Sequence, residues 1–397
     1  MKRGGKLLMS CDEYVYCHNG VYYAGSQDKA DFYKRYLRVF NRLRLVARCV
    51  SKQQIDSNWC ALDQRIEFIG LPFYRGPKEY ARHFFEVGRI LKGVANGCDA
   101  ALLRLPSTES MRVYQEVKHA KIPYAAEIVY DAYDGFASSN SLIHKLLWLM
   151  IDRRMRHICY RADGVSCVTE HYLQRRYFTK KRDGFSSHYS SLALPKSFYG
   201  GVRTFPQKEV LTIAHIANQV EYNSRKGHNE LIEAIAKLKK GGLIVNVSFV
   251  GKDYLGGQAR LEELASIKGV ENQVNFLGYL DRASLDDFLN NADLYVMPTR
   301  AEGLPRVIIE AMAKGLPCIS THVSGNPELL GNHWLVGYDD VDALVERIKE
   351  LCTNRAIYEA TSKENFDNSH KYEASILEKR RDEFYNKLKK SRLGQQQ

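Results

Sequence analysis

Residues 297–317 read MPTRAEGLPRVIIEAMAKGLP, and this stretch decides the fold of the second half of the chain. Its opening Met297 closes a short apolar run, and Pro305 stands where the first turn of a helix tolerates proline. The free amides at a helix start carry partial positive charge and bind phosphate well. Glu302 and Glu310 supply carboxylates, which accept paired hydrogen bonds from neighbouring hydroxyls such as those of sugars. The stretch predicts a strand–loop–helix site for a ligand with phosphates and hydroxyls; otherwise Glu302 caps the helix and Glu310 faces solvent.

Outward from this stretch, β-rich runs alternate with amphipathic runs, which is typical of parallel sheets covered by helices. In the second half the predicted strands are Leu211–Ala217, Val245–Val250, Val274–Phe276, Leu294–Met297 and Pro317–Ser320. The predicted helices there are Asn229–Lys239, Ala259–Ile267, Leu285–Asn290, Pro305–Lys314, Asp340–Cys352 and Ser375–Ser391.

The first half shows the same alternation. Its predicted strands are Lys6–Cys11, Leu43–Val50, Ile66–Ile69, Ala100–Leu105, Tyr124–Tyr130 and Gly164–Thr169. Its predicted helices are Asp31–Asn41, Pro77–Val94, Thr108–His119 and Ser141–Tyr160.

The chain therefore divides into two Rossmann-like α/β domains, an N-terminal one at 1–195 and a C-terminal one at 206–370. Between them, Ser190–Phe205 lacks periodicity and is predicted to be the linker. Residues 371–397 are predicted to form a helix that packs back toward the first domain and ends in a frayed tail. We expect the two parallel sheets to face each other across a cleft, with ligands at the carboxyl ends of the strands.

Charge is unevenly distributed along the chain. Residues 1–200 hold 32 Lys and Arg against 19 Asp and Glu, whereas residues 201–397 hold 26 against 27. The surplus is concentrated in Phe32–Arg48 and Arg153–Arg182. A positive field confined to one domain indicates an anionic partner such as a phospholipid surface, a lipid pyrophosphate or nucleic acid. The alternative is a solvated basic face.

Composition excludes several classes of protein. The apolar fraction of 45% and the charged fraction of 26% are those of a globular protein. No apolar run is long enough to span a bilayer, and Leu7-Leu8-Met9 is too short for a signal peptide. The nine cysteines show no metal-ligand spacing, which favours reduced thiols and a cytoplasmic location.

The segment Leu211–Leu330 resembles the family 4 (group 1) glycosyltransferases of the GT-B fold. Glu302 and Glu310 match that family's Glu-x7-Glu signature. Further matching motifs are Phe249-Val250-Gly251-Lys252, Phe276-Leu277-Gly278-Tyr279, Asn291-Ala292-Asp293-Leu294-Tyr295-Val296-Met297-Pro298 and Ser324-Gly325-Asn326-Pro327-Glu328-Leu329. The match of several motifs in the same order is more specific than any one of them.

The resemblance implies roles for individual residues. Glu310 would hold the nucleotide ribose, and Glu302 would contact the donor sugar together with the amides of Gly303 and Leu304. Lys226, in a Lys-Gly pair as in the family, would stabilise the leaving diphosphate. The family's other cation is missing, because Asn218 or Gln219 stands in its place, and Arg225 is the candidate substitute. Gly278 and Tyr279 match the family's loop beside the nucleotide base. In that loop backbone groups contact the ring, so the sequence does not distinguish a UDP-sugar from a GDP-sugar.

The first domain offers weaker candidates. Many relatives have a histidine near the end of Tyr124–Tyr130, where this chain has Asp131 and Asp134. The stretch is similar to a turn in polysaccharide-assembly enzymes, and it suggests that Asp131 faces the acceptor or the donor sugar; the alternative is a turn-forming aspartate. His18-Asn19-Gly20 follows the first strand, and Gly20 could let this loop approach the donor phosphates.

The helix predicted at Ser141–Tyr160 has an apolar face with Trp148, followed by Arg153, Arg154 and Arg156. This pattern suits a helix lying on an anionic membrane. It suits a domain-core helix with a basic end equally well.

Together these features predict a retaining glycosyltransferase with a UDP- or GDP-sugar donor and no metal cofactor. The basic first half favours a lipid-linked saccharide acceptor in surface polysaccharide synthesis, with peripheral contact at the inner face of the plasma membrane. A nucleic-acid partner is not expected, because no recognition motif is present. The alternatives are a non-catalytic nucleotide-sugar-binding protein and a same-fold sugar-nucleotide epimerase.

Overall fold

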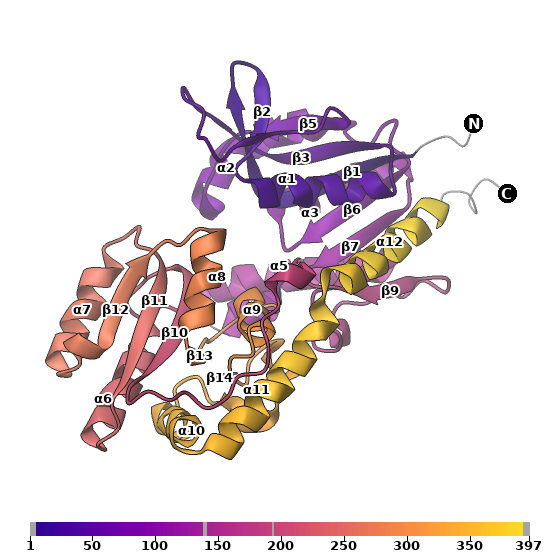
Figure 1. Cartoon of the computed structure of the whole chain (residues 1–397). Coiled ribbons are helices and arrows are strands. Elements are labelled where there is room, and N and C mark those ends of the chain that lie inside the picture. Colours follow the sequence, from indigo (N-terminus) through magenta and orange to yellow (C-terminus); the bar gives the residue numbers. More distant parts are fainter. Residues whose placement is uncertain (1–4, 138–140, 193, 392–397) are drawn as a thin grey trace. The chain divides into compact units, whose positions relative to one another are not determined.

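The computed structural model describes residues 5–137, 141–192 and 194–391. The chain forms two compact units: Met1–Tyr189 together with Glu378–Gln397 is the first, and Ser190–Leu377 is the second. Each unit is an α/β sheet covered by helices (Figure 1).

Unit 1 is built on a nine-stranded sheet. Its parallel part comprises β1 (Lys6–His18), β3 (Arg42–Ser51), β5 (Ile66–Leu71), β6 (Ala100–Leu105), β7 (Tyr124–Ile128), β8 (Gly164–Cys167) and β9 (Phe185–His188). The central strands β6, β7 and β8 are almost wholly buried, because a parallel strand is covered on both faces. Every predicted strand of the first half is found, with small shifts at the ends except in β1.

The prediction that β1 ends at Cys11 is wrong. The strand continues to His18 and turns back into β2 (Val21–Ala24), which pairs antiparallel with β1 and with β4 (Cys60–Ala61). Asn19 and Gly20 both have positive φ, as a two-residue hairpin turn requires. The sheet of unit 1 is therefore mixed rather than purely parallel.

Helices cover the sheet of unit 1. They are α1 (Gln27–Lys34), which continues as a 3-10 turn (Arg35–Arg38), α2 (Gly76–Leu91), α3 (Thr108–Ala120), α4 (Ala132–Ala137) and α5 (Leu142–Arg161). The predicted helix Asp31–Asn41 lies partly outside α1, since the helix begins at Gln27 after Ser26, whose side chain accepts from the Lys29 amide.

The last helix, α12 (Ala374–Ser391), lies beside β7 and β9 of unit 1 (yellow in Figure 1). Its Tyr385 hydroxyl donates to the carboxylate of Glu127 on β7 at 2.7 Å, and Tyr189 donates to the same oxygen at 2.8 Å. Burial would raise the pKa of Glu127, but Arg35, Arg104 and the two tyrosine hydroxyls lower it. The buried carboxylate therefore stays charged and joins the C-terminal helix to the centre of the sheet.

Unit 2 contains a wholly parallel six-stranded sheet in the order β12-β11-β10-β13-β14-β15. The strands are β10 (Leu211–Gln219), β11 (Val245–Lys252), β12 (Val274–Gly278), β13 (Leu294–Met297), β14 (Cys318–Thr321) and β15 (Leu335–Val336). The helices are α6 (His228–Lys240), α7 (Gly257–Ile267), α8 (Arg282–Asn291), α9 (Arg306–Ala313), α10 (Val341–Thr353) and α11 (Arg355–Ser369). All the strands and helices predicted for this half are found, and β15 and α11 are additions.

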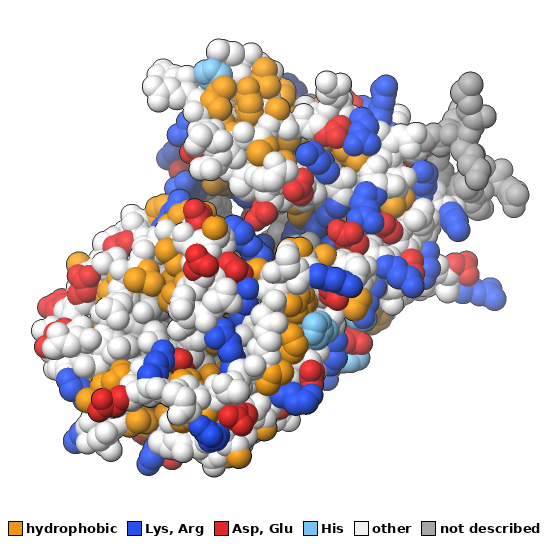
Figure 2. All heavy atoms as spheres, in the orientation of Figure 1, with side chains coloured by type: hydrophobic (Ala, Val, Ile, Leu, Met, Phe, Trp, Pro, Cys, Tyr) orange, Lys and Arg blue, Asp and Glu red, His pale blue; other side chains and the backbone are white. Residues whose placement is uncertain are grey.

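The stretch predicted to be a linker packs on unit 2. Arg203 donates to the carbonyls of Lys314 and Asn290, each at 2.8 Å, and its amide donates to Ser362 at 2.7 Å. On the face shown in Figure 2, acidic and basic side chains are interspersed over unit 2, in keeping with the balanced charge of residues 201–397. Among the described residues, no helix is long and apolar enough to cross a membrane.

Candidate active site

The carboxyl ends of neighbouring strands in unit 2 carry most of the predicted site. β10 ends at Gln219, β12 ends at Gly278 just before Tyr279, and β13 leads into the loop that holds Glu302. Because parallel strands end at one edge of their sheet, the sheet order brings these segments together. The three segments lie far apart in the sequence and meet through topology alone.

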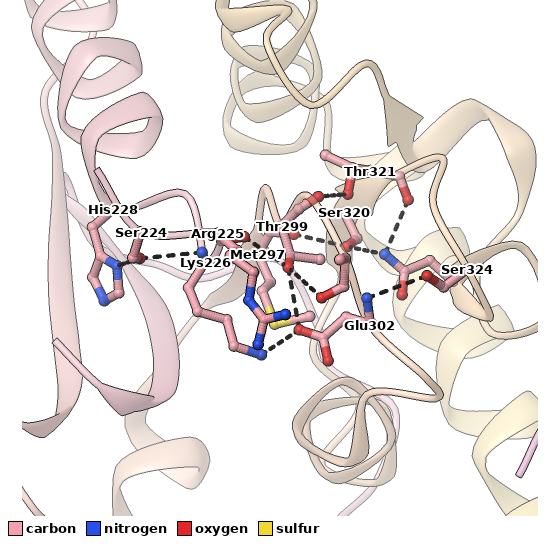
Figure 3. A network of polar contacts seen from close by, with 12 residues as sticks. Ser224, Arg225, Lys226, His228, Met297, Thr299, Glu302, Ser320, Thr321 and Ser324 are labelled. Atoms are coloured by element: carbon pink, nitrogen blue, oxygen red, sulfur yellow. Dashed lines mark hydrogen bonds and ion pairs between the residues drawn. The ribbon is translucent and has the colours of Figure 1, made fainter. Parts of the chain in front are cut away.

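Lys226 and Glu302, predicted to act on the diphosphate and on the sugar, form an ion pair through Nζ and Oε1 (Figure 3). The hydroxyl of Thr299 lies 3.2 Å from the same Oε1. Both partners are largely buried, with side-chain exposures of 28% and 13%, so solvent screens this pair less than a surface pair. The site therefore holds one cation and one carboxylate in contact at the sheet edge.

The loop that presents Lys226 is anchored on both sides. The hydroxyl of Thr299 and the amide of Arg300 donate to the carbonyl of Arg225 at 3.0 and 2.8 Å. The Arg225 side chain extends from this loop toward Glu302 in Figure 3. Both cations predicted for the diphosphate are thus held at one place by main-chain hydrogen bonds.

Gly227, which follows Lys226, is the N-cap residue of helix α6 and has a φ of +80°. A Cβ added there would lie 2.1 Å from the carbonyl oxygen of Pro298. The Lys-Gly pair therefore has a structural reason: only glycine lets the lysine loop approach the loop after β13 so closely.

Two buried histidines lie behind the lysine loop. The Ser224 hydroxyl accepts from the Lys226 amide at 3.1 Å and forms a hydrogen bond with Nδ1 of His228 at 2.9 Å. The His215 ring lies 4.7 Å from that of His228, and its Nδ1 donates to the Val296 carbonyl at 2.9 Å. Burial lowers the pKa of His215 to about 4, and burial together with His215 and Lys226 lowers that of His228 to about 2. Both rings are neutral supports of the loop at physiological pH.

The loop of Glu302 is fixed by the segment after β14. The Glu302 amide donates to the Ser324 hydroxyl at 3.2 Å, and the Gly325 amide donates to the Gly303 carbonyl at 3.1 Å. Asn326 is fully buried and donates to the Ser320 hydroxyl and the Thr321 carbonyl. The motif Ser324–Leu329, quoted above only for its resemblance, thus supports the loop that carries the carboxylate.

Helix α9 starts one residue later than predicted. Pro305 is the N-cap residue, and the helix runs from Arg306, with Leu304 buried just before it. Glu310 is 5% exposed, so it does not face solvent, and Oε1 accepts from Arg282 at 2.7 Å. Arg282 is the partner that a carboxylate in an apolar run requires. No sequence pattern singled it out, because it comes from the start of α8.

Tyr279 is exposed and its ring lies 4.5 Å from the ammonium of Lys252, at the end of β11. Gln219 is half-buried and pairs in register with the same Lys252. Tyr279, predicted beside the base, and Gln219, which stands in place of the family's missing cation, thus both lie next to Lys252 of the motif Phe249–Lys252.

In unit 1, Asp131 lies after β7 and is buried. Its Oδ1 accepts from the Tyr177 hydroxyl at 2.8 Å and from the Tyr133 amide at 2.9 Å, and Arg176 lies 3.6 Å from Oδ2. The same Tyr177 hydroxyl lies 2.8 Å from Oδ1 of Asp152 on α5, so the two carboxylates share its one hydrogen. Asp131 therefore belongs to a buried network of polar contacts, and its contact with the acceptor or the donor sugar stays a prediction.

Gly20 occupies the hairpin turn between β1 and β2, so its positive φ has a local structural cause. His18 Nδ1 lies 3.1 Å from the Lys52 carbonyl at this hairpin. The sequence did not predict this hairpin, and a contact of Gly20 with the donor phosphates stays a prediction.

No group of three or more His, Cys, Asp or Glu with a metal-binding arrangement lies in the described parts of the chain. The charged groups at the sheet edge are the carboxylates of Glu302 and Glu310 with their partners Lys226 and Arg282.

The chain is similar to a known protein family and to several known proteins. Residues 213–368 match the family described as glycosyl transferases group 1. The chain is 26% identical over 344 residues to Protein CapJ of Staphylococcus aureus, covering 86% of this chain and 85% of CapJ. It is 31% identical over 153 residues to the putative colanic acid biosynthesis glycosyltransferase WcaL of Escherichia coli K12, covering 36% of this chain and 37% of WcaL.

Among solved structures, Anabaena Alr3699/HepE in complex with UDP and glucose matches with a TM-score of 0.67 at 16% identity. The match covers 96% of this chain and 98% of HepE. At this identity the likeness shows the fold, which is GT-B with two α/β domains.

Proposed function

The chain is a group 1 glycosyltransferase with the GT-B fold, and from this premise we propose that it uses a nucleoside diphosphate sugar as donor. In this proposal the sugar passes to an acceptor hydroxyl with its anomeric configuration kept and no metal ion taking part. The observation that carries the proposal is the Lys226–Glu302 pair beside the start of α9.

The chemistry assigns each group a role. Lys226 and Arg225 stabilise the negative charge that builds on the diphosphate as the bond between C1 and the phosphate oxygen breaks. Glu302 accepts hydrogen bonds from the sugar hydroxyls, and Glu310 accepts from the ribose hydroxyls. The acceptor oxygen bonds to C1 on the face that the diphosphate leaves, and its proton passes to the leaving diphosphate. Asp131 remains a candidate for the acceptor side, acting through the buried network of Tyr177.

The relatives support an acceptor in surface polysaccharide assembly. WcaL is named as a colanic acid biosynthesis glycosyltransferase, and HepE was solved with UDP and glucose. The charge surplus in residues 1–200 favours an acceptor presented on a lipid carrier at an anionic membrane. UDP-sugars are therefore the first donors to test, and lipid-linked saccharides the first acceptors.

The test is release of free nucleotide from a panel of UDP- and GDP-sugars, with and without a lipid-linked saccharide. We expect acceptor-dependent release by the wild type and a loss of about a hundredfold or more in Lys226→Ala and Glu302→Gln. Lys237→Ala is the matched control. The side chain of Lys237 is exposed on α6 and forms an ion pair with Asp342. The anomeric configuration of the product follows from its proton NMR coupling constant.

Other outcomes would replace the proposal. Donor binding without release of nucleotide indicates a binding protein, and conversion of the sugar while it stays on the nucleotide indicates an epimerase. Full turnover in both Lys226→Ala and Glu302→Gln would remove the assigned site.

A further inference from the structure

Helix α5 exposes an apolar face that unit 1 does not cover. The exposures are 82% for Leu142, 79% for Ile143, 61% for Leu146, 45% for Leu149 and 62% for Met150. Their spacing of one, four, seven and eight residues places them on one side of the helix. Single exposed apolar residues are ordinary, but a contiguous apolar face marks an interaction surface.

The opposite side of the same helix is firmly packed. Met155, Ile158 and Cys159 lie in the core of unit 1, and Trp148 and Ile151 pack against that core. Asp152 is buried and bonded to Tyr177. The orientation of α5 is therefore fixed, and the apolar side chains are held outward by the fold.

The same face becomes basic further along the helix. Arg153, His157 and Arg161 follow Leu146 and Met150 at helical spacing, and all are exposed. Arg154, Arg161 and Lys118 of α3 surround His157; burial and these cations lower its pKa. The C-terminal half of the face is thus a positive patch with no acid among the charges that act on His157.

We propose that this face of α5 docks on an anionic lipid bilayer, with its first two turns at the acyl boundary and its later turns at the headgroups. Residues 142–150 rise by about 12 Å, far less than a bilayer thickness, which suits an interfacial helix. The graded order from aliphatic to cationic matches the polarity gradient of a lipid leaflet. Nucleic acid would leave the five aliphatic side chains without a partner.

This surface deepens the membrane contact proposed above and is independent of the donor site. Asp152 shares the Tyr177 hydroxyl with Asp131, so the docking face and the predicted acceptor-side residue belong to one buried network. Docking through α5 would bring that part of unit 1 to the membrane surface, where a lipid-linked saccharide is presented.

The experiment measures co-sedimentation of the whole chain with vesicles of phosphatidylglycerol and phosphatidylcholine, or of phosphatidylcholine alone. We expect preferential binding to the anionic vesicles, weakened about tenfold or more by Leu146→Glu with Met150→Glu. Leu255→Glu with Ile267→Glu, at exposed apolar positions of unit 2, is the matched control and should bind as the wild type does. Arg153→Glu with Arg161→Glu should weaken binding and flatten its dependence on salt.

Equal binding by the wild type and the Leu146/Met150 variant, with circular dichroism showing both folded, would overturn the proposal. So would self-association that this variant abolishes while vesicle binding is unchanged, since the face would then be a protein interface. Nucleotide release measured on the same variants separates the two proposals. Glu302→Gln should lose transfer and keep vesicle binding, and the α5 variants should keep release with a water-soluble acceptor.

Discussion

At the scale of single residues, the site is organised by pairs whose members come from different elements. Glu302 meets Lys226 across two loops, and Glu310 meets Arg282 across two helices. The signature carboxylates were predictable because they occur in one short stretch with a proline and an apolar helix. Arg282 was not, because it comes from the start of α8 and no local pattern marks it as the partner of Glu310.

Replacing Glu310 by Gln tests the ribose contact. The amide keeps the shape and still accepts from Arg282, so we expect the melting temperature to change by only a few degrees. Donor affinity should fall about tenfold, because hydrogen bonds to a charged acceptor are stronger than those to a neutral one. Isothermal titration with UDP and the UDP-sugar measures the change. An unaltered affinity would remove Glu310 from the donor site.

The two buried histidines predict how the stability of unit 2 depends on pH. His215 and His228 have folded-state pKa values lowered by burial to about 4 and about 2. The unfolded chain binds protons near pH 6.5 and the folded chain does not, so their stabilising contribution is full above pH 6.5 and declines below it. The free energy of unfolding should fall by up to about 2.7 kcal/mol per pH unit between pH 6 and 4.

Urea unfolding at several pH values, followed by the fluorescence of buried Trp334, measures this slope. His215→Phe should roughly halve this slope. His333 is exposed, so His333→Phe should remove only its ion pair with Glu350 and leave the slope from the two buried histidines unchanged. A slope that is the same in both variants would contradict the assignment.

At the scale of elements, prediction succeeded where apolar periodicity is strong and failed where polar residues are buried. β6 and β13 lie where their apolar runs predict them. Helix α11 was missed because its inward face is largely polar: Thr361, Ser362 and Asn365 are buried beside Tyr358. The β1–β2 hairpin was missed because β1 leaves the covered part of the sheet, so alternation replaces the apolar run beyond Cys11.

The close contact of Gly227 at the start of α6 predicts how much an alanine there would destabilise unit 2. Gly227 and Gly256 are both N-cap residues with positive φ, of α6 and α7 respectively. A Cβ at Gly227 meets the Pro298 carbonyl, whereas at Gly256 no atom lies within 4 Å. Gly256→Ala should cost about 1 kcal/mol for the backbone alone, and Gly227→Ala at least about 2 kcal/mol more.

The midpoints of urea unfolding of the two alanine variants give this difference. Gly227→Ala should also lose transferase activity beyond its loss of stability, because Lys226 shifts with the loop. Equal destabilisation by both substitutions would show that the contact with Pro298 relaxes at no cost.

At the scale of the whole molecule, unit 1 depends on a segment from the far end of the chain. Arg38 pairs with Glu378 and Asp382 of α12, and Tyr385 reaches the buried Glu127. The sequence predicted a C-terminal helix, but no local signal marks Glu127, which lies within a five-residue run of otherwise apolar and aromatic residues.

Tyr385→Phe tests this dependence. Removing the hydroxyl takes one donor from a buried carboxylate, so unit 1 should lose about 1–3 kcal/mol. Differential scanning calorimetry should show a lowered transition for unit 1 and an unshifted one for unit 2. Tyr254→Phe, at an exposed position of unit 2, is the control. A shift of the unit 2 transition alone would contradict the assignment of Tyr385 to unit 1.

The return of α12 to unit 1 has a consequence for biosynthesis. A ribosome releases the chain from the amino end, so the first sheet emerges long before the helix that completes it. Until residues 378–391 leave the exit tunnel, Glu127 has no Tyr385 and Arg38 has no acid from α12. The second unit, by contrast, is almost entirely synthesised by then. We therefore expect the later-made half to mature first, and the amino-terminal half to need chaperone protection in the interval.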